Sequence, residues 1–138
     1  MHEMGIIHSL AKTLEDMAAE QNITKYGSVT LEVGEVSGII TELFEDYWQF
    51  YTEKHPVLKG SVLKLETIKA VTLCTECGKT YETVKYGKTC PHCGSTETYL
   101  TTTYYDSAGN PINGTDVIIK EVEAETDDDR TGETVVQA

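Results

Sequence analysis

The chain has 138 residues, enough for one compact core with a small metal-stabilised module beside it. It carries 23 acidic and 11 basic residues, a formal net charge of −12, which argues against a nucleic-acid partner because phosphate binding needs clustered lysine and arginine. No apolar run approaches the roughly 20 residues of a membrane span, and the first residues do not resemble a secretory signal. We therefore expect a cytoplasmic protein without a membrane partner, in which cysteines stay reduced.

The first predicted element is an amphipathic helix that covers about residues 4–21. Its apolar residues recur at three- and four-residue spacing, which is typical of one buried helix face. These residues are Met4, Ile7, Leu10, Ala11, Leu14, Met17 and Ala18. After the helix, Val29, Leu31 and Val33 alternate with polar or small residues and predict a half-buried strand.

A second helix is predicted to begin at Thr41, with the threonine as N-cap and Glu42 in the first turn. Its apolar stripe has the period of a helix and could pack on the core or form a partner surface; core packing is the expectation. The stripe consists of Leu43, Phe44, Tyr47, Trp48 and Tyr51. Residues 62–68 read as a strand, so the strand–helix–strand order predicts a βαβ crossover.

The second half of the chain contains the cysteines and then returns to strand. Residues 99–105 are rich in Thr and Tyr and are expected to be extended, and residues 106–114 are dense in turn formers. A last strand is predicted over residues 115–123. Seven acids and one base lie between Glu121 and Ala138, and this end of the chain is typical of a frayed acidic tail.

These elements predict an α+β protein: a small mixed sheet of about three strands with two helices, and an inserted zinc-ribbon-like domain with four cysteines. The predicted boundaries follow the chain in order. They are 1–69 for the α+β domain, completed by 115–123, then 70–105 for the zinc-binding domain, 106–114 for a turn-rich insertion and 124–138 for the acidic tail.

Four cysteines form the most specific motif: Cys74, Cys77, Cys90 and Cys93, each pair with two residues between its members and followed by glycine. Two such pairs can place four thiolates in a closed tetrahedron, the usual arrangement of structural zinc. Thiolates also suit iron, as in a rubredoxin-like protein, and isolated zinc ribbons often bind proteins or nucleic acid. His92 is an alternative ligand or an outer donor, although four thiolates already complete the coordination.

The N-terminus offers a second set of donors. The Met1 amine, the His2 amide nitrogen and the His2 imidazole can chelate one metal ion, with the Glu3 amide nitrogen as a further donor. Such nitrogen sets favour square-planar nickel(II) or copper(II). On the residues alone, the alternative is an ordinary solvated terminus. His8 lies six residues further along the helix, so it points elsewhere and is a poor co-ligand within one chain. Glu35 and Glu42 are acids that the sequence cannot place relative to this terminus.

In combination, three motifs resemble the HypA/HybF family of nickel metallochaperones, in order from Met1 to about Val122. The motifs are Met1-His2-Glu3-Met4 at the start of a helix, Leu31-Glu32-Val33-Gly34-Glu35-Val36-Ser37-Gly38, and the cysteine pairs with Cys90-Pro91-His92-Cys93-Gly94. The turn-rich stretch from Asp106 and the tail from Thr126 depart from the family pattern and could alter partner choice or oligomeric state.

The resemblance implies a non-enzymatic protein with two metals. It implies that Met1, His2 and Glu3 bind nickel(II) as cargo, with His2 as the essential ligand, and that the four cysteines hold structural zinc. The expected role is delivery of nickel to a nickel-iron hydrogenase large-subunit precursor, together with a partner GTPase. A homodimer is compatible with these expectations. The sequence shows neither a nucleophile paired with a general base nor a phosphate-binding glycine loop, so an enzyme is not expected.

Overall fold

The computed structural model describes residues 2–126 and 134–137, with the backbone alone for His2 and for residues 134–137. The chain forms two compact units. The helix–sheet unit consists of Met1–Leu31, Ile39–Glu66 and Ile118–Ala138; the cysteine unit consists of Glu32–Gly38 and Thr67–Val117. No helix among the described residues combines the length and apolar composition that crossing a membrane requires.

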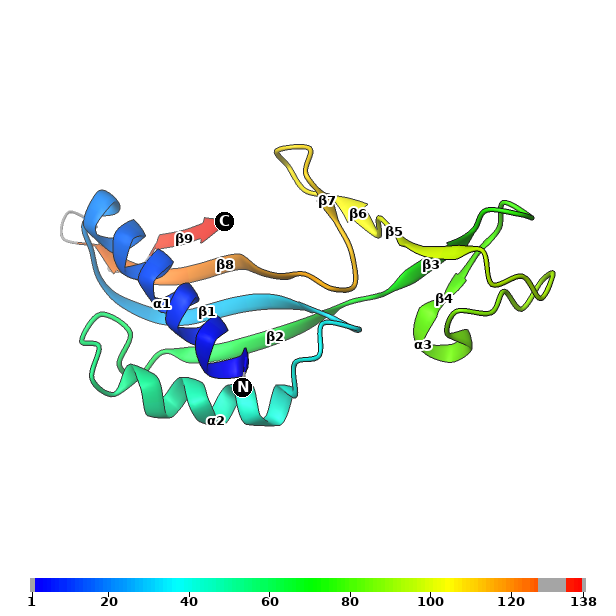
Figure 1. Ribbon diagram of the computed structural model, residues 1–138. Coiled ribbons are helices and arrows are strands. Elements are labelled where there is room, and N and C mark those ends of the chain that lie inside the picture. The colour runs from blue at the N-terminus through cyan, green and yellow to red at the C-terminus, as the bar shows by residue number, and fades with distance from the viewer. Residues whose placement is uncertain (1, 127–133, 138) are drawn as a thin grey trace. The chain divides into compact units, whose positions relative to one another are not determined.

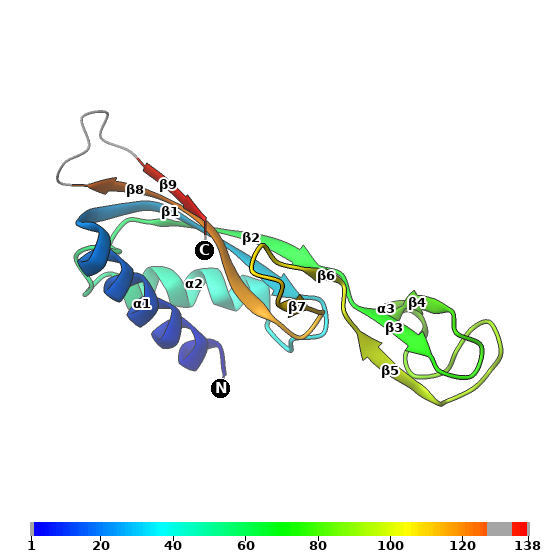
Figure 2. The same ribbon diagram turned by 90° about the horizontal axis from the view of Figure 1, so that it is seen from above.

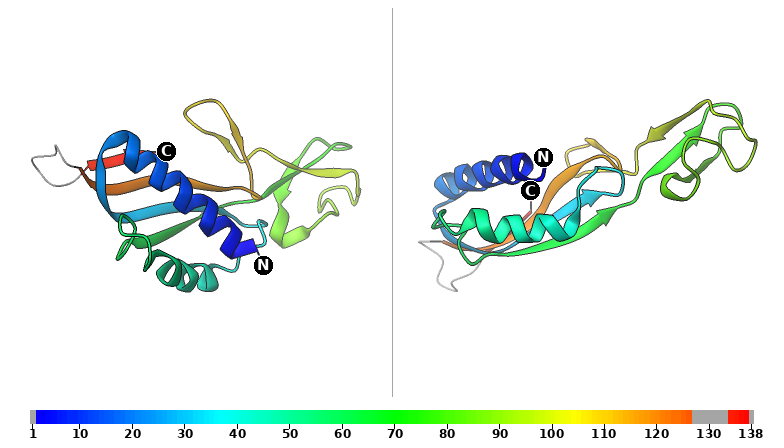
Figure 3. Two further views of the ribbon diagram at one scale, coloured as in Figure 1. Left: turned by 60° about the vertical axis from the view of Figure 1, so that its left-hand side comes forward. Right: turned by 60° about the horizontal axis from the view of Figure 1, so that its bottom comes forward.

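The helix–sheet unit is built from α1, α2 and a four-stranded sheet of order β2-β1-β8-β9. Strands β1 and β2 run in the same direction and β8 runs opposite, so the sheet is mixed as predicted (Figure 1). Both helices cover the same face of the sheet (Figures 2 and 3). The bounds are α1 (His2–Gln21), β1 (Ile23–Gly34), α2 (Thr41–Thr52), β2 (Val62–Ile68), β8 (Val117–Thr126) and β9 (Thr134–Gln137).

The predicted apolar face of α1 is the centre of this unit's core. Its partners come from the inward face of β1, from α2 and from the strands on either side of β1. The side chains that are at most 2% exposed include Ile7, Ala11, Leu14, Tyr26, Val29, Leu31, Phe44, Trp48, Leu58, Val122 and Ala124. Two polar atoms in the core have partners: the Tyr26 hydroxyl donates to the Leu14 carbonyl at 2.6 Å, and the Trp48 Nε1–H donates to Ser61 Oγ at 3.0 Å.

Three predicted boundaries are wrong. Ile40, not Thr41, is the N-cap residue of α2, and no side-chain cap bond is made there. Strand β1 begins at Ile23, ahead of the predicted alternation of Ser28 to Gly34, because the successive exposed residues Thr24 and Lys25 interrupt the alternation that a sequence pattern requires. Residues 124–126 continue β8 instead of beginning the acidic tail.

The predicted tail also contains a strand, because Thr134–Gln137 pair with β8 as β9, antiparallel from Glu121↔Gln137 to Ala124↔Thr134. Alternation explains the extension of β8, since Val122 and Ala124 are buried and Glu123 lies between them. The remainder of the predicted tail, residues 127–133 and Ala138, lies outside the described residues.

The cysteine unit contains two small antiparallel sheets and a single helical turn. Strand β3 pairs with both β4 and β5, and β6 pairs with β7 around the turn that begins at Asp106. The predicted insertion 106–114 therefore forms the tip and second strand of a hairpin. The bounds are β3 (Val71–Cys74), β4 (Thr80–Glu82), α3 (Thr83–Tyr86), β5 (Thr98–Thr101), β6 (Tyr104–Tyr105) and β7 (Pro111–Ile112).

Three backbone segments of the cysteine unit meet at two glycines. A Cβ atom on Gly34 would lie 2.1 Å from the Gly114 carbonyl oxygen, and one on Gly114 would lie 2.5 Å from the Ala70 Cβ. The Val36 N–H donates to the Gly114 carbonyl at 2.8 Å across the same crossing. Glycine is required at these positions because of close approach.

Candidate metal centres

The two cysteine pairs adopt the same local fold. In the first, the Gly78 N–H donates to the Cys74 carbonyl at 2.9 Å; in the second, the Gly94 N–H donates to the Cys90 carbonyl at 2.9 Å. Both glycines have positive φ, 74° and 78°, a backbone region that residues with a Cβ rarely enter. The glycine that follows each pair therefore lets the chain turn sharply and bring two sulfurs to one side.

The four sulfurs converge on one point. The Sγ atoms of Cys74 and Cys93 are 3.6 Å apart, those of Cys77 and Cys90 are 3.7 Å apart, and all four lie within 4.8 Å of one another. Sulfurs in a tetrahedron about 2.3 Å from a zinc ion lie about 3.8 Å apart, whereas a disulfide requires about 2 Å. The arrangement therefore fits a closed thiolate site, and all four cysteines are free.

The electrostatics of the cluster favour a bound cation. The backbone N–H of Cys77 is the main cause that lowers the pKa of the Cys74 thiol, to about 7. For Cys93, the Ser95 N–H favours the thiolate, but the neighbouring Cys74 thiol and burial outweigh it and raise the pKa to about 12. Neighbouring thiolates oppose one another's ionisation, and a divalent ion removes that opposition.

His92 does not join the sulfurs. Its ring Nε2 lies 3.4 Å from the Thr80 carbonyl oxygen, and its backbone N–H donates to Cys90 Sγ at 3.4 Å. Among the described residues, the four cysteines are the only group of at least three Cys, His, Asp or Glu side chains placed to share a metal ion. The role that the geometry gives His92 is that of an outer donor through its backbone.

At the N-terminus, the predicted donors are described only in part. Met1 and the His2 side chain lie outside the described residues. The Glu3 side chain is 5% exposed, and its Oε2 accepts a long hydrogen bond, 3.4 Å, from the Ile40 N–H. Because Ile40 is the N-cap residue of α2, the carboxylate lies at the positive end of that helix. Sequence reasoning did not foresee this contact, since an acid in the first turn of α1 is unremarkable by itself.

The other acids and histidines near this part of the sequence have separate partners. The Tyr51 hydroxyl lies 2.8 Å from Nδ1 of His8. The Glu35 carboxylate accepts a hydrogen bond from the Ala70 N–H at 2.9 Å and pairs with Lys69 at 3.4 Å, so it ties together two segments of the cysteine unit. Glu42 is exposed in the first turn of α2.

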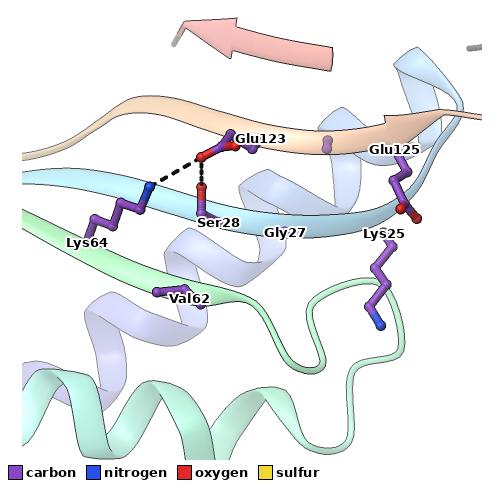
Figure 4. Close-up of a pocket in the computed structure, with 8 residues that line it drawn as sticks. Lys25, Gly27, Ser28, Val62, Lys64, Glu123 and Glu125 are labelled. Atoms are coloured by element: carbon purple, nitrogen blue, oxygen red, sulfur yellow. Dashed lines mark hydrogen bonds and ion pairs between the residues drawn. The ribbon is translucent and has the colours of Figure 1, made fainter. Parts of the chain in front are cut away.

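A shallow depression of about 450 Å³ lies on the face of the sheet that is turned away from α1 (Figure 4). Its polar groups already satisfy one another: Glu123 accepts a hydrogen bond from Ser28 at 2.9 Å and pairs with Lys64 at 3.2 Å. Lys25 and Glu125 extend along its rim (Figure 4). The depression offers no cluster of metal-binding groups and resembles an ordinary ion-paired sheet face.

The sequence profile described as "Hydrogenase/urease nickel incorporation, metallochaperone, hypA" matches residues 1–105. The chain belongs to the HypA family. The hydrogenase maturation factor HypA of Aquifex aeolicus is 31% identical over 127 residues, which are 92% of this chain and 100% of the relative. The corresponding factor of Methanocella arvoryzae is 32% identical over 128 residues, 91% of this chain and 99% of the relative.

The solution structure of the Ni metallochaperone HypA from Helicobacter pylori has the same fold, with a TM-score of 0.61 and 22% identity over 92% of this chain and all of that one. The predicted family and α+β fold class are thus confirmed. HypA is a family of metallochaperones for nickel incorporation and hydrogenase maturation, not a family of enzymes. The metal-handling function follows from membership, and the cysteine cluster is its visible metal-binding group.

Proposed function

We propose that this HypA-family chain binds nickel(II) at its N-terminus and delivers it to a nickel-iron hydrogenase large-subunit precursor. The observation that carries the proposal is that the family match begins at Met1, so Met1, His2 and Glu3 fall within it. The nickel is cargo, with the Met1 amine and His2 as principal ligands and Glu3 assisting. A partner GTPase takes part in insertion, and the exchange takes place in the cytoplasm.

The start of a helix suits this task for a physical reason. The first four N–H groups of a helix have no intrahelical acceptor, and α1 begins at His2, so the amide nitrogens of His2 and Glu3 are not needed for the helix. A deprotonated amide carries negative charge, which the positive end of the helix dipole favours. Terminal ligands can also be removed one at a time by an acceptor, which suits a metal that must be released.

The cysteines serve the opposite purpose in this proposal. Four thiolates leave no open position, so Cys74, Cys77, Cys90 and Cys93 hold zinc permanently and stabilise the cysteine unit. The donor set would also accept iron, and metal analysis of the purified untagged protein distinguishes the two, since an iron–thiolate protein is coloured. In this proposal residues 70–105 form the zinc-binding domain. In the sequence they separate the two parts of the nickel-binding domain, residues 1–69 and 115–123.

Nickel titration tests the proposal. Calorimetry on zinc-loaded protein should give a dissociation constant at least about 100-fold weaker for His2→Ala, because about 3 kcal/mol is lost with the imidazole ligand. His8→Ala is the matched control and should bind nickel like wild type. One extra residue before Met1 should also weaken nickel binding without changing the zinc content. Equal affinity in wild type and His2→Ala would refute the N-terminal site.

A further inference from the structure

Helix α2 presents an apolar ridge to solvent. Ile40 is 53% exposed, Leu43 is 36% exposed and Phe50 is 72% exposed. Together with the half-buried Tyr47 they follow one another at spacings of three, four and three residues, which places them in a single row along the helix. We call these four residues the α2 ridge. Single exposed apolar residues are common in proteins, but a continuous row indicates a contact surface.

The ridge is distinct from the core face of the same helix. Phe44 and Trp48 are fully buried and supply the packing against the rest of the helix–sheet unit. Phe50 contributes little to that packing although it is large, because nearly three quarters of its surface remains in water. Burying an aromatic side chain on a partner is favourable, so the exposed ring is a substantial source of binding energy.

The surface of α2 beside the ridge is acidic, because Asp46 and Glu53 lie one helical turn from Leu43 and Phe50. Within Thr41–Glu53 there are four acids and no lysine or arginine, and all four acids are exposed. They are Glu42, Glu45, Asp46 and Glu53. A second copy of this chain would bring acids against acids if it docked ridge to ridge, and like charges across an interface are unfavourable. The complementary occupant carries apolar side chains flanked by lysine or arginine.

The first residue of the ridge also contacts the N-terminal segment. The Ile40 N–H is the donor to the Glu3 carboxylate, so the ridge begins one hydrogen bond away from a residue of the proposed nickel site. We propose that the α2 ridge is the docking surface for a protein that exchanges nickel with this chain, through a basic amphipathic segment of that protein. This inference rests on the proposed function for the identity of the exchange, and the surface itself rests on exposure and charge.

Binding of two synthetic helical peptides to the zinc-loaded full-length protein tests the surface. Both peptides carry the same leucine stripe, which is flanked by lysines in one peptide and by glutamates in the other. The lysine peptide should bind, and the double variant Leu43→Ser/Phe50→Ser should bind it at least about tenfold more weakly. Asp46→Asn/Glu53→Gln should weaken binding about threefold and reduce its salt dependence. The partner GTPase, titrated against the same variants, should give the same order.

Val84→Ser is the matched control, because Val84 is 62% exposed on α3 of the cysteine unit. It should leave peptide and GTPase binding within about twofold of wild type. Trp48 fluorescence, which reports the core of the helix–sheet unit, should be the same in every variant. Equal loss with Val84→Ser, or equal binding of the glutamate peptide, would overturn the proposal. So would a dimer that Leu43→Ser/Phe50→Ser dissociates, since the occupant would then be a second copy.

Nickel affinity separates the two proposals. Leu43→Ser/Phe50→Ser should bind nickel like wild type, whereas His2→Ala should still bind the lysine peptide. If His2→Ala keeps nickel while the ridge variants lose the peptide, the proposed nickel site fails and the docking surface stands. If the ridge variants keep the peptide and the GTPase while His2→Ala loses nickel, the docking surface fails alone.

Discussion

The helix–sheet unit and the cysteine unit obtain their stability from different sources. The first encloses large apolar side chains from α1, α2 and β1, and Trp48 and Phe44 are fully buried there. In the second, the cluster around the metal-binding groups consists of Cys74, Tyr81 and Cys90 with Cys77 packed against it. The sulfurs occupy the place that leucine and phenylalanine occupy in the first unit. One unit is therefore expected to fold by apolar burial and the other by metal ligation.

Removing the metal from the cysteine unit is the largest test of this comparison. Zinc chelation, or Cys90→Ser, should abolish amide protection in β3, β4 and β5, because structural zinc supplies on the order of 10 kcal/mol to modules of this kind. The single tryptophan, Trp48, lies in the other unit, so its fluorescence should stay unchanged. Hydrogen exchange measures the amide protection, and fluorescence of the same sample measures the environment of Trp48.

Leu14→Ala is the converse control, since Leu14 is fully buried in the helix–sheet unit. It should lower that unit's free energy of unfolding by about 2–5 kcal/mol and leave the zinc content unchanged. A loss of Trp48 burial on zinc removal would mean that the two units unfold together and that the comparison is wrong.

Close packing of the backbone is the second source of stability in the cysteine unit, and Gly114→Ala tests it. The added methyl group would meet the Ala70 Cβ at 2.5 Å, so we expect a loss of about 1–3 kcal/mol in unfolding free energy. Amide hydrogen exchange in residues 67–117 of the zinc-loaded protein measures this loss of unfolding free energy. Gly5→Ala is the control, because no atom apart from its chain neighbours and the adjacent helix backbone lies within 4 Å of its added Cβ, and alanine favours the α1 helix. An unchanged Gly114→Ala protein would show that the crossing is loose.

The smallest expected effect is a pH-dependent change in stability at the face of the sheet that is turned away from α1. The Ser28 hydroxyl and then Lys64 lower the pKa of Glu123, so the ionised carboxylate stabilises the fold above its ordinary pKa. This contribution is lost as pH falls through the lowered value. Ser28→Ala should therefore lower the stability of the fold only slightly at pH about 7, since the Glu123 side chain is 44% exposed, and the difference should shrink below pH about 4.

Urea unfolding followed by Trp48 fluorescence at both pH values gives this difference. Thr24→Ala is the control, because the Thr24 hydroxyl donates to the Glu125 backbone carbonyl, which does not titrate. If the cost of Ser28→Ala were the same at both pH values, the hydrogen bond to the ionised carboxylate would not be its source.

Periodicity and spacing predicted the parts of the molecule in which one interaction dominates. The apolar face of α1 follows from a helical repeat, and the sulfur cluster follows from the paired cysteines with their glycines. The start of β1 could not be predicted, because Ile23 and Tyr26 are buried at a spacing that matches no strand period. The predicted N-cap of α2 lies one residue too late, because the threonine next to the true cap suggests a side-chain bond that the helix does not make.

Long-range contacts could not be predicted from one sequence. The hydrogen bond between Glu3 and Ile40 joins residues 37 positions apart, and nothing local marks either residue. The crossing of Gly34 and Gly114 is of the same kind, since each glycine by itself reads as a turn former. The predicted apolar stripe of α2 mixes two faces of the helix: Phe44 and Trp48 are buried, whereas Leu43 is 36% exposed and lies on the α2 ridge with Phe50, which the stripe omits.

The position of β8 in the sheet has a consequence for synthesis of the chain. Strand β8 lies beside β1, yet residues 69–116 are made between β2 and β8. At a translation rate of about 5–20 residues per second, several seconds separate the two strands. By the end of that interval the whole cysteine segment has been synthesised, while β1 has β2 beside it but still lacks β8. Metal supply to the nascent cysteines can therefore precede completion of the four-stranded sheet, so the cysteine unit can take up its metal before the helix–sheet unit has its final strands.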